Sequence, residues 1–150
     1  MTRDEHWMTQ VLSLAKTAAK QNEVPIAALI VDKDDRVVSS AFNQKERNQD
    51  ATSHAEIEAI RKAGVALQNW RLLDCTMYTN LEPCVMCAGA IYQARIKRLV
   101  FGATDPKMGG VESVFEVLDC KNINHSTAWQ NGVLADQSRE MLSQFFKKRR

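Results

Sequence analysis

The strongest constraint on the fold of this chain is a set of potential metal ligands in two distant segments. His54 and Glu56 form an H-x-E motif, and Cys84 and Cys87 form a C-x-x-C motif. Imidazole and thiolate are ligands that zinc prefers, and a catalytic zinc site uses three protein ligands and leaves the fourth position to water. Cys84 follows His54 by 30 positions (84 − 54), so the fold has to bring two remote segments together. The motifs predict a zinc site formed by His54, Cys84 and Cys87.

The local sequence places both motifs at the beginning of helices. Ser53 and Glu56 have the S-x-x-E spacing of a capping box, which predicts a helix that continues to about Ala66. Pro83 suits the first position of a second helix that contains both cysteines. Residues three apart share one face of a helix, so the two thiols would face the same ion. The partial positive charge of a helix N-terminus stabilises thiolates there.

Glu56 is the predicted proton carrier. A zinc ion lowers the pKa of its bound water toward about 7. A carboxylate two residues from the histidine ligand can accept that proton, deliver it to a ring nitrogen and then protonate a leaving amine. The predicted reaction is a hydrolytic deamination.

Each motif also has a simpler interpretation. The C-x-x-C pair is compatible with a redox or structural role, and Glu56 with a role as the capping partner of Ser53 alone. The motifs together favour catalysis, because a redox pair needs neither a histidine nor an acid at an upstream helix start. A closed structural zinc site needs a fourth ligand, and the remaining candidates each stand alone: Cys75, Cys120, His6 and His125. We expect Cys75 and Cys120 to be buried or surface residues without a ligand role.

Hydrophobic periodicity predicts strands that alternate with helices in one domain spanning residues 1–150. Apolar residues recur at helical spacing from Asp4 to about Lys20 and again near the C-terminus. Expected strands lie at 26–32, 36–42, 76–79 and 99–101, a polar loop at 43–52 and a short helix at 114–118. The expected fold class is α/β, a three-layer α/β/α sandwich with a mixed sheet.

Composition and charge limit the class of protein. A length of 150 residues with 45% hydrophobic residues suits a single domain with its own core. No apolar run approaches the roughly 20 residues of a membrane span, and the N-terminus does not resemble a signal peptide, so we expect a cytoplasmic protein outside the membrane. The net charge of +2 does not itself indicate a nucleic-acid partner. Two basic clusters, one at Arg95, Lys97 and Arg98 and one at 147–150, are candidates for phosphate contacts or for solvated surface.

Several further segments point to a known family. Residues 69–72 read Asn-Trp-Arg-Leu, residues 81–90 surround the two cysteines, and residues 100–103 read Val-Phe-Gly-Ala. The run 132–136 is followed by Phe145, Phe146 and a basic tail. In these segments, and over nearly its whole length, the chain resembles the bacterial tRNA-specific adenosine deaminases of the cytidine deaminase-like superfamily. H-x-E followed by P-C-x-x-C is a known signature of zinc-dependent nucleobase deaminases.

The resemblance implies conversion of adenosine to inosine at the first anticodon position of tRNA. It also implies a cytidine deaminase-like fold with a central five-stranded sheet, one Zn²⁺ per subunit on the three ligands above, and Glu56 as proton shuttle. The implied partners are the tRNA anticodon loop and a second subunit, since the family is homodimeric. The implied substrate contacts are Asn43 for the target base, then Pro25, Leu81, Asp105, Lys107 and Phe146.

Some positions depart from the family pattern: Ala27 in place of Gly, Ala51 in place of Pro, Thr79-Asn80 in place of Val-Thr, and Glu112 in place of Gly. We expect Asn80 to place an amide near the substrate pocket and Glu112 to repel phosphate. Two alternatives stay open, a free-base deaminase such as a guanine deaminase and a noncatalytic RNA-binding subunit. The basic C-terminal helix argues against the first, and the intact Glu56 argues against the second.

Overall fold

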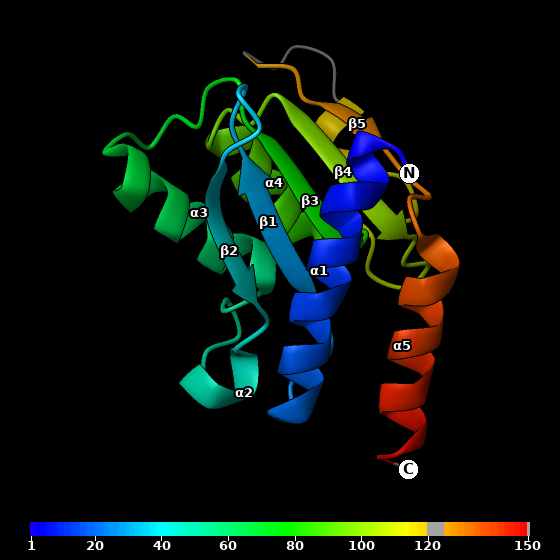
Figure 1. The fold of residues 1–150 in the computed structure, drawn as a ribbon. Helices are drawn as coiled ribbons and strands as arrows, with labels where there is room; N and C mark the ends of the chain where they lie inside the picture. Colours follow the sequence, from blue (N-terminus) through cyan, green and yellow to red (C-terminus); the bar gives the residue numbers. More distant parts are fainter. Residues whose placement is uncertain (120–124, 150) are drawn as a thin grey trace.

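The computed structural model describes residues 1–119 and 125–149, which form three layers around one sheet (Figure 1). The helices are α1 (Arg3–Lys20), α2 (Lys45–Asn48), α3 (Ala55–Leu67), α4 (Val85–Gln93) and α5 (Ala135–Lys147), with a 3₁₀ turn η1 at Val117–Asp119. The strands are β1 (Ala27–Val31), β2 (Val37–Phe42), β3 (Thr76–Leu81), β4 (Arg98–Ala103) and β5 (Ala128–Gln130).

The strands form a mixed sheet in the order β2-β1-β3-β4-β5. β1 pairs antiparallel with β2 and β3, whereas β3, β4 and β5 run parallel. Helices α1 and α5 lie on one face and α3 and α4 on the other (Figure 1). The predicted three-layer sandwich with a mixed five-stranded sheet is confirmed. Because β3 and β4 are parallel, the segments that follow both strands emerge at the same edge of the sheet.

Both faces of the sheet are packed against helices, which makes it a rigid base. All five residues of β1 are buried, as expected for a central strand covered on both sides. Met77, Ile91 and Leu99 belong to the core beneath α3 and α4. Met8 and Tyr78 belong to the core beneath α1. Side chains that extend beyond the ends of β3 and β4 therefore start from fixed positions.

The expected helices at the two termini and at the metal motifs are present, but both helix starts near the metal motifs differ from the prediction. The N-cap of α3 is His54, with no side-chain cap, so the predicted capping box between Ser53 and Glu56 is wrong. The Ser53 hydroxyl instead accepts a hydrogen bond from Asn48. Helix α4 has Cys84 as its N-cap, so Pro83 precedes the helix rather than occupying its first position. In both cases a metal-motif residue takes the capping position.

Two loop predictions also differ from the structure. The polar segment 43–52 contains the single-turn helix α2. Backbone N–H groups in its first turn donate hydrogen bonds to a side chain from another part of the chain. Residues 114–118 do not form a helix, and the 3₁₀ turn η1 begins at Val117. The short strand β5 alternates exposed and half-buried residues, so its sequence carries no strong strand signal. No helix of the described residues is both long and apolar enough to cross a lipid bilayer.

Candidate active site

The predicted metal ligands converge where α3 and α4 begin. His54 and Cys84 are the N-caps of these helices, and Cys87 is the third residue of α4. The Nδ1 atom of His54 lies 3.6 Å from Sγ of Cys84 and 3.5 Å from Sγ of Cys87. All three donor atoms lie within 4.8 Å of one another, and among the described residues no other cluster of His, Cys, Asp or Glu has this arrangement. We call this group, together with Glu56, the metal corner.

The donor spacing fits a tetrahedral metal ion. Zinc binds imidazole nitrogen at about 2.0–2.1 Å and thiolate sulfur at about 2.3 Å, which separates the two donors by about 3.6 Å in a tetrahedron. The two nitrogen–sulfur distances measured from His54 match that separation. The group supplies three ligands, so a fourth position stays available for a small molecule.

The two thiols are not equivalent. A hydrogen bond with the Cys87 thiol, assisted by His54, lowers the pKa of Cys84 to about 4, so Cys84 carries a thiolate at neutral pH. The same hydrogen bond, together with burial, raises the pKa of Cys87, and the hydrogen bond that His54 donates to the Cys84 thiolate raises the pKa of His54. The proton shared between the two cysteines is one that a bound metal ion would displace.

Glu56 lies beside these ligands and is almost completely buried. It is the second residue of α3 and is 4% exposed. Burial raises the pKa of its carboxyl group to about 7, which suits a group that has to gain and lose a proton near neutral pH. With Ser53 excluded as the helix cap, the capping interpretation of Glu56 is wrong.

A cavity of about 850 Å³ opens next to the metal corner. Its lining includes His54, Glu56 and Cys84. Predicted substrate contacts that also line it are Asn43, Leu81, Asp105, Lys107 and Phe146. Pro25 does not line the cavity, although its neighbours Val24 and Ile26 do. The structure thus brings the metal motifs and most of the implied substrate contacts to one site.

Glu82, which the sequence analysis did not single out, holds the loop 104–115 in place. Its carboxylate is buried and accepts hydrogen bonds from the backbone N–H groups of residues 105, 111, 112 and 113 at 2.9–3.1 Å. It also accepts one from the Ser113 hydroxyl. Burial is the largest single influence and acts to raise the pKa of Glu82, but these hydrogen bonds together outweigh it and lower the pKa. The loop carries Asp105 and Lys107, so Glu82 fixes one wall of the cavity.

Close packing around Glu82 requires glycine in this loop. A Cβ atom on Gly109 would lie 2.3 Å from the Glu82 carboxylate, and one on Gly110 would lie 2.6 Å from the backbone nitrogen of Val85. Gly110 donates a backbone hydrogen bond to Pro83 at 2.7 Å, and Gly109 forms a β-bridge with Cys84. The loop therefore also packs directly against the segment that carries a metal ligand.

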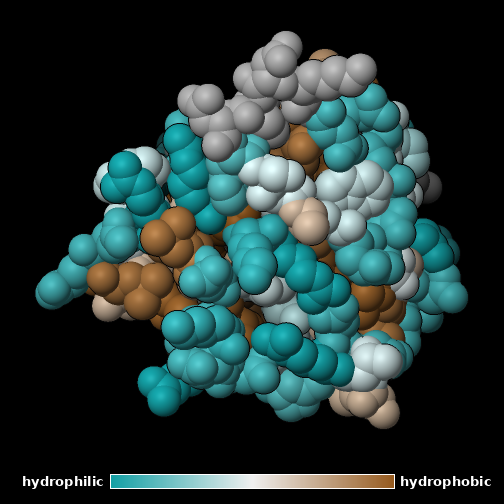
Figure 2. All heavy atoms as spheres, turned by 90° about the horizontal axis from the view of Figure 1, so that it is seen from above, coloured by the Kyte–Doolittle hydropathy of each residue, from teal (hydrophilic) through white to brown (hydrophobic). Residues whose placement is uncertain are grey.

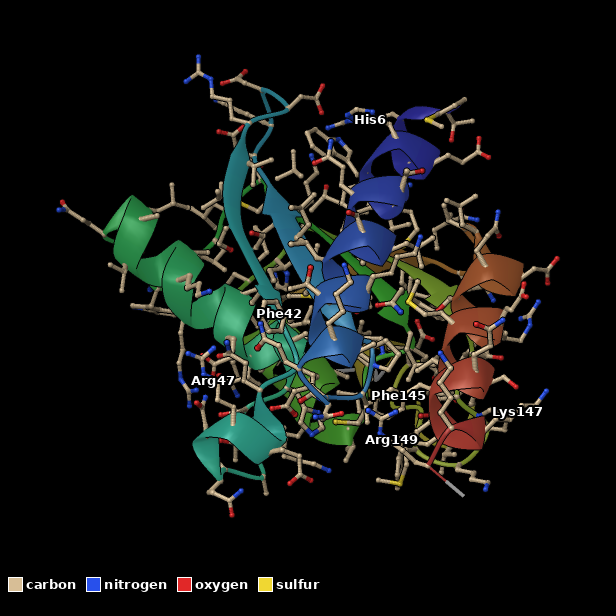
Figure 3. All side chains as sticks on the ribbon, turned by 60° about the horizontal axis from the view of Figure 1, so that its bottom comes forward. His6, Phe42, Arg47, Phe145, Lys147 and Arg149 are labelled. Carbon is tan, nitrogen blue, oxygen red and sulfur yellow. The ribbon has the colours of Figure 1, made fainter. Side chains whose placement is uncertain are left out.

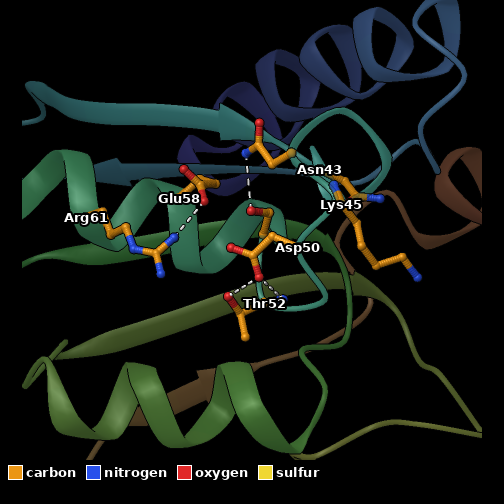
Figure 4. A network of polar contacts seen from close by, with 8 residues as sticks. Asn43, Lys45, Asp50, Thr52, Glu58 and Arg61 are labelled. Atoms are coloured by element: carbon orange, nitrogen blue, oxygen red, sulfur yellow. Dashed lines mark hydrogen bonds and ion pairs between the residues drawn. The ribbon is translucent and has the colours of Figure 1, made fainter.

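A second buried acid, Glu23, positions the opposite wall. Its carboxylate accepts hydrogen bonds from the backbone N–H groups of Glu46 at 3.0 Å and Arg47 at 2.7 Å, in the first turn of α2. Asp50 accepts hydrogen bonds from the backbone and hydroxyl groups of Thr52 nearer to α3 (Figure 4). The loop that carries Asn43 and Lys45 is thereby fixed at two points.

Side chains at the end of α5 and just after it contact the segment that follows α1. Arg149 donates a hydrogen bond to the Asn22 side chain at 2.9 Å, and its guanidinium lies 3.5 Å from the centre of the Phe145 ring. Figure 3 shows Arg149 and Phe145 directed toward the end of α1, whereas Lys147 points away from it. Arg149 lines the cavity, so the described residues of the basic tail are not equivalent.

Three departures from the family pattern have structural explanations. Asn80 is completely buried and bonded to backbone and side-chain groups. It lies next to Leu81 of the cavity wall, as expected for an amide near the pocket, but does not itself line the cavity. Ala27, also completely buried, donates its backbone N–H to Asn80 at 2.9 Å. Glu112 accepts a hydrogen bond from the Asn131 amide. Its carboxylate is engaged with the segment before α5.

The other predicted basic cluster lies away from the cavity. Arg98 begins β4, whereas the cavity is lined by Thr104 and Asp105 beyond the end of that strand. Both terminal nitrogens of Arg98 bond the Asp4 carboxylate at 2.7 and 2.9 Å, and Arg95 stacks near Trp70 and Tyr92. The end of the molecule opposite the cavity is mostly hydrophilic, with hydrophobic side chains in separate small groups (Figure 2). These two arginines make intramolecular contacts.

The other cysteines and histidines of the chain are the remaining candidates for further metal ligands. Cys75 is buried and is not part of the metal corner. His125 contacts the Ile96 carbonyl at 2.8 Å and His6 contacts Gln10 on the surface. Cys120 lies outside the described residues.

Similarity to known proteins places the chain in a family. The family model described as MafB19-like deaminase matches residues 2–150. The tRNA-specific adenosine deaminase of Haemophilus influenzae (strain ATCC 51907 / DSM 11121 / KW20 / Rd) is 45% identical over 147 residues, which cover 98% of this chain and 85% of that protein. The corresponding enzyme of Aquifex aeolicus (strain VF5) is 42% identical and covers 97% of this chain and 95% of that protein.

Solved structures agree with this relationship. A structure from a study of A-to-I editing by tRNA:A34 deaminases at the wobble position superposes with a TM-score of 0.87, at 41% identity over 91% of this chain and 99% of that one. The guanine deaminase of Bacillus subtilis superposes with a TM-score of 0.66, at 30% identity over 99% of this chain and 94% of that one. Similarity in both sequence and fold is greater to the tRNA deaminases, and the chain belongs to the family of tRNA-specific adenosine deaminases.

Proposed function

We propose that this protein converts adenosine to inosine at the first anticodon position of tRNA, in a hydrolysis that consumes water and releases ammonia. The observation that carries the proposal is the convergence of His54, Cys84 and Cys87 with buried Glu56 beside one cavity. The relatives at 42–45% identity carry the name of this activity. A tRNA substrate also leads us to expect the enzyme in the cytoplasm.

Zinc is the metal that the donor set supports. One imidazole and two thiolates form a soft, nitrogen–sulfur site of tetrahedral spacing, which favours zinc over magnesium or calcium. His54, Cys84 and Cys87 would hold one zinc ion per subunit, which would supply an activated water molecule at neutral pH. Glu56 takes one proton of that water at its carboxylate and delivers it to a ring nitrogen of the base. After the oxygen has added to the ring carbon, Glu56 takes the second proton of the former water and passes it to the amine, which leaves as ammonia.

The cavity walls suit a nucleotide that has left its stack. An unpaired anticodon loop lets a base swing out at low energetic cost. We assign the Asn43 amide to hydrogen bonding with the base and Leu81 to its apolar wall, since both line the cavity. We assign Asp105, Lys107 and Phe146, which also line the cavity, to contacts with the RNA backbone. Pro25 contributes through the adjacent residues rather than directly.

A second copy of the chain is the partner we propose for the apolar surface beside the cavity. Val85, Met108, Val114 and Phe115 are between 45% and 60% exposed. They gather around Gly109 and Gly110, where Val114 and Phe115 donate backbone hydrogen bonds to the Gly109 carbonyl. Exposed apolar patches of this kind favour protein interfaces. A subunit seated there would also extend the cavity wall.

The dimer can be tested by sedimentation of wild-type protein and of Phe115→Glu. We expect a dimer for the wild type and a monomer for the variant, and Val65→Glu, at an exposed apolar residue of α3, serves as the matched control. A wild-type monomer, or an unchanged dimer in Phe115→Glu, would contradict the assignment of this surface.

The activity can be tested with zinc-loaded protein and an RNA hairpin that carries adenosine at the first anticodon position. We expect inosine at that position and none in a matched hairpin with adenosine moved to the second anticodon position. Guanine is the parallel substrate. Xanthine formation without RNA editing would assign the protein to free-base deamination, and inactivity on both substrates would support a noncatalytic subunit.

A further inference from the structure

Helix α5 forms part of the cavity, and few of its side chains are buried. Among its 13 residues, Ala135–Lys147, only Ser138 and Phe145 are buried. Its N-cap, Leu134, has a left-handed conformation and makes no side-chain cap. Leu142 and Phe146 of α5 nevertheless line the cavity. Small changes in the tilt of this helix would therefore change the width of the substrate site.

Ser138 lies on the same side of α5 as the cavity-lining residues. Residues four apart on a helix share one face, so Ser138, Leu142 and Phe146 form a single row. Phe145 and Arg149 form the adjacent row, at the end where Arg149 bonds Asn22. The helix is thus held at its far end by the Phe145 and Arg149 contacts, in its middle by Met141, which packs against the core beneath α1, and near its start by the hydrogen bonds of Ser138.

Ser138 is held by Asn80 in a closed hydrogen-bond network. The Ser138 hydroxyl donates a hydrogen bond to the backbone carbonyl of Asn80 at 2.6 Å and accepts one from the Asn80 side-chain NH₂ group at 3.2 Å. The same amide donates to the Pro25 carbonyl at 2.9 Å, and its oxygen accepts from the backbone N–H of Ala27 at 2.9 Å. Both Asn80 and Ser138 are 0% exposed. Every polar atom of the Asn80 side chain has a partner.

This network joins three walls of the cavity. Pro25, Asn80 and Ser138 do not line the cavity, but each lies next to or one helical turn before residues that do. These cavity-lining residues are Val24 and Ile26 beside Pro25, Leu81 and Glu82 after Asn80, and Leu142 one turn after Ser138. A threonine at position 80, as in the family pattern, has one hydroxyl and cannot satisfy Ala27, Pro25 and Ser138 together. The departures at positions 27 and 80 therefore belong to one buried cluster.

We propose that Asn80 is a positioning residue which, through Ser138, sets the tilt of α5 and hence the fit of the substrate RNA between α5 and the opposite wall. The inference rests on the proposed RNA substrate for its effect on catalysis. Its structural part, the attachment of α5 by Asn80, does not depend on the substrate. Asn80 itself does not touch the metal corner or the cavity.

The test uses Ser138→Ala and Asn80→Thr in the full-length, zinc-loaded protein, with Ser143→Ala on the exposed side of α5 as the matched control. Losing this attachment should raise KM for the anticodon hairpin about five- to tenfold while kcat changes less than about twofold, from the usual strength of buried hydrogen bonds. A purely structural role would lower the melting temperature without this separation of KM and kcat.

Hydrogen exchange gives a second readout that needs no activity. Backbone amides of α5 should exchange faster in Ser138→Ala and Asn80→Thr, while those of α3 and α4 stay unchanged. Ser138→Ala removes both hydrogen bonds between the two residues, whereas Asn80→Thr removes the one from the side-chain amide and leaves the backbone carbonyl of residue 80 in place. Because one bond is lost in both variants, the effect of the double variant should be smaller than the sum of the two single effects. Asn80→Thr retains a hydroxyl of the kind the family carries, so it provides the test if Ser138→Ala does not fold.

The outcomes separate this proposal from the proposed function. Faster exchange in α5 with unchanged KM, or unchanged exchange in α5, would overturn the positioning role. An inactive wild-type protein on the hairpin would refute the proposed function, and the exchange data would then still decide whether Asn80 holds α5. Additive effects of the two substitutions would show that they act on separate contacts.

Discussion

The metal corner and the cavity rim, formed by loop 104–115 and α5, are built in different ways. The metal corner uses two helix starts, and each ligand follows from the position of its residue at or near an N-cap. The rim is held by buried polar side chains whose partners lie far away in the sequence, such as Glu82 with residues 105–113 and Asn80 with Ser138. Chemistry and substrate fit are therefore separable by mutation.

The largest expected effect concerns the metal corner. Glu56→Gln should reduce kcat by about 10²–10⁴-fold, the usual contribution of a general acid–base group, while zinc content stays at one per subunit. Metal analysis and single-turnover deamination of the hairpin provide the measurement. Cys87→Ala is the contrasting variant and should lose both metal and activity. A Glu56→Gln protein that deaminates at the wild-type rate would refute the proton-shuttle role.

Glu82→Gln is the corresponding change in the rim. The new amide NH₂ would face backbone N–H donors of loop 104–115, and unsatisfied buried groups of this kind cost about 1–3 kcal/mol each. We expect weaker hairpin binding, a lower free energy of unfolding and faster amide exchange at residues 111–113. Glu140→Gln, exposed on α5, is the matched control. Retained protection of those amides would show that Glu82 does not hold the loop.

Asp4→Asn should change stability without changing either region. Arg98, helped by the Tyr78 hydroxyl, holds the pKa of Asp4 below its usual value despite partial burial. A carboxyl group whose pKa is lowered on folding stabilises the folded protein at pH values above its pKa in the unfolded chain. This stabilisation is lost as the pH falls through its pKa in the folded protein. The free energy of unfolding of the wild type should exceed that of Asp4→Asn by about 1–2 kcal/mol at pH 7.

Urea unfolding at pH 7 and below pH 4 measures this difference, which should shrink on acidification. KM for the hairpin should be the same in both proteins. A difference that is independent of pH would mean that the carboxylate charge of Asp4 is not the source of its stabilisation.

The smallest expected effect distinguishes two cations at the end of α5. Arg149→Gln should weaken hairpin binding several-fold and reduce the salt slope by about one, as expected for a lost phosphate contact. Lys147→Gln, whose side chain points away from the wall (Figure 3), should have a smaller effect. Binding titrations at several salt concentrations provide the measurement, and equal effects would assign the whole tail to general electrostatic attraction.

The sequence by itself determined the chemistry of the metal corner. His54, Cys84, Cys87 and Glu56 are identified by motifs that a metal site needs wherever it occurs. Periodicity also predicted α1, β1 to β4 and the basic C-terminal helix, because regular patterns of buried residues are local properties of the sequence. The resemblance to a family supplied the substrate contacts that line the cavity.

Only the tertiary structure decided how the cavity walls are held. Asn80 was expected near the pocket, but the sequence did not specify its partners Ala27 and Ser138, which lie 53 and 58 residues away and make it a buried link. Glu82 and Glu23 likewise accept hydrogen bonds from backbone N–H groups of loops that lie 23–31 residues away in the sequence. A buried polar side chain takes whichever partners the fold brings to it, and no local pattern in the sequence specifies that choice.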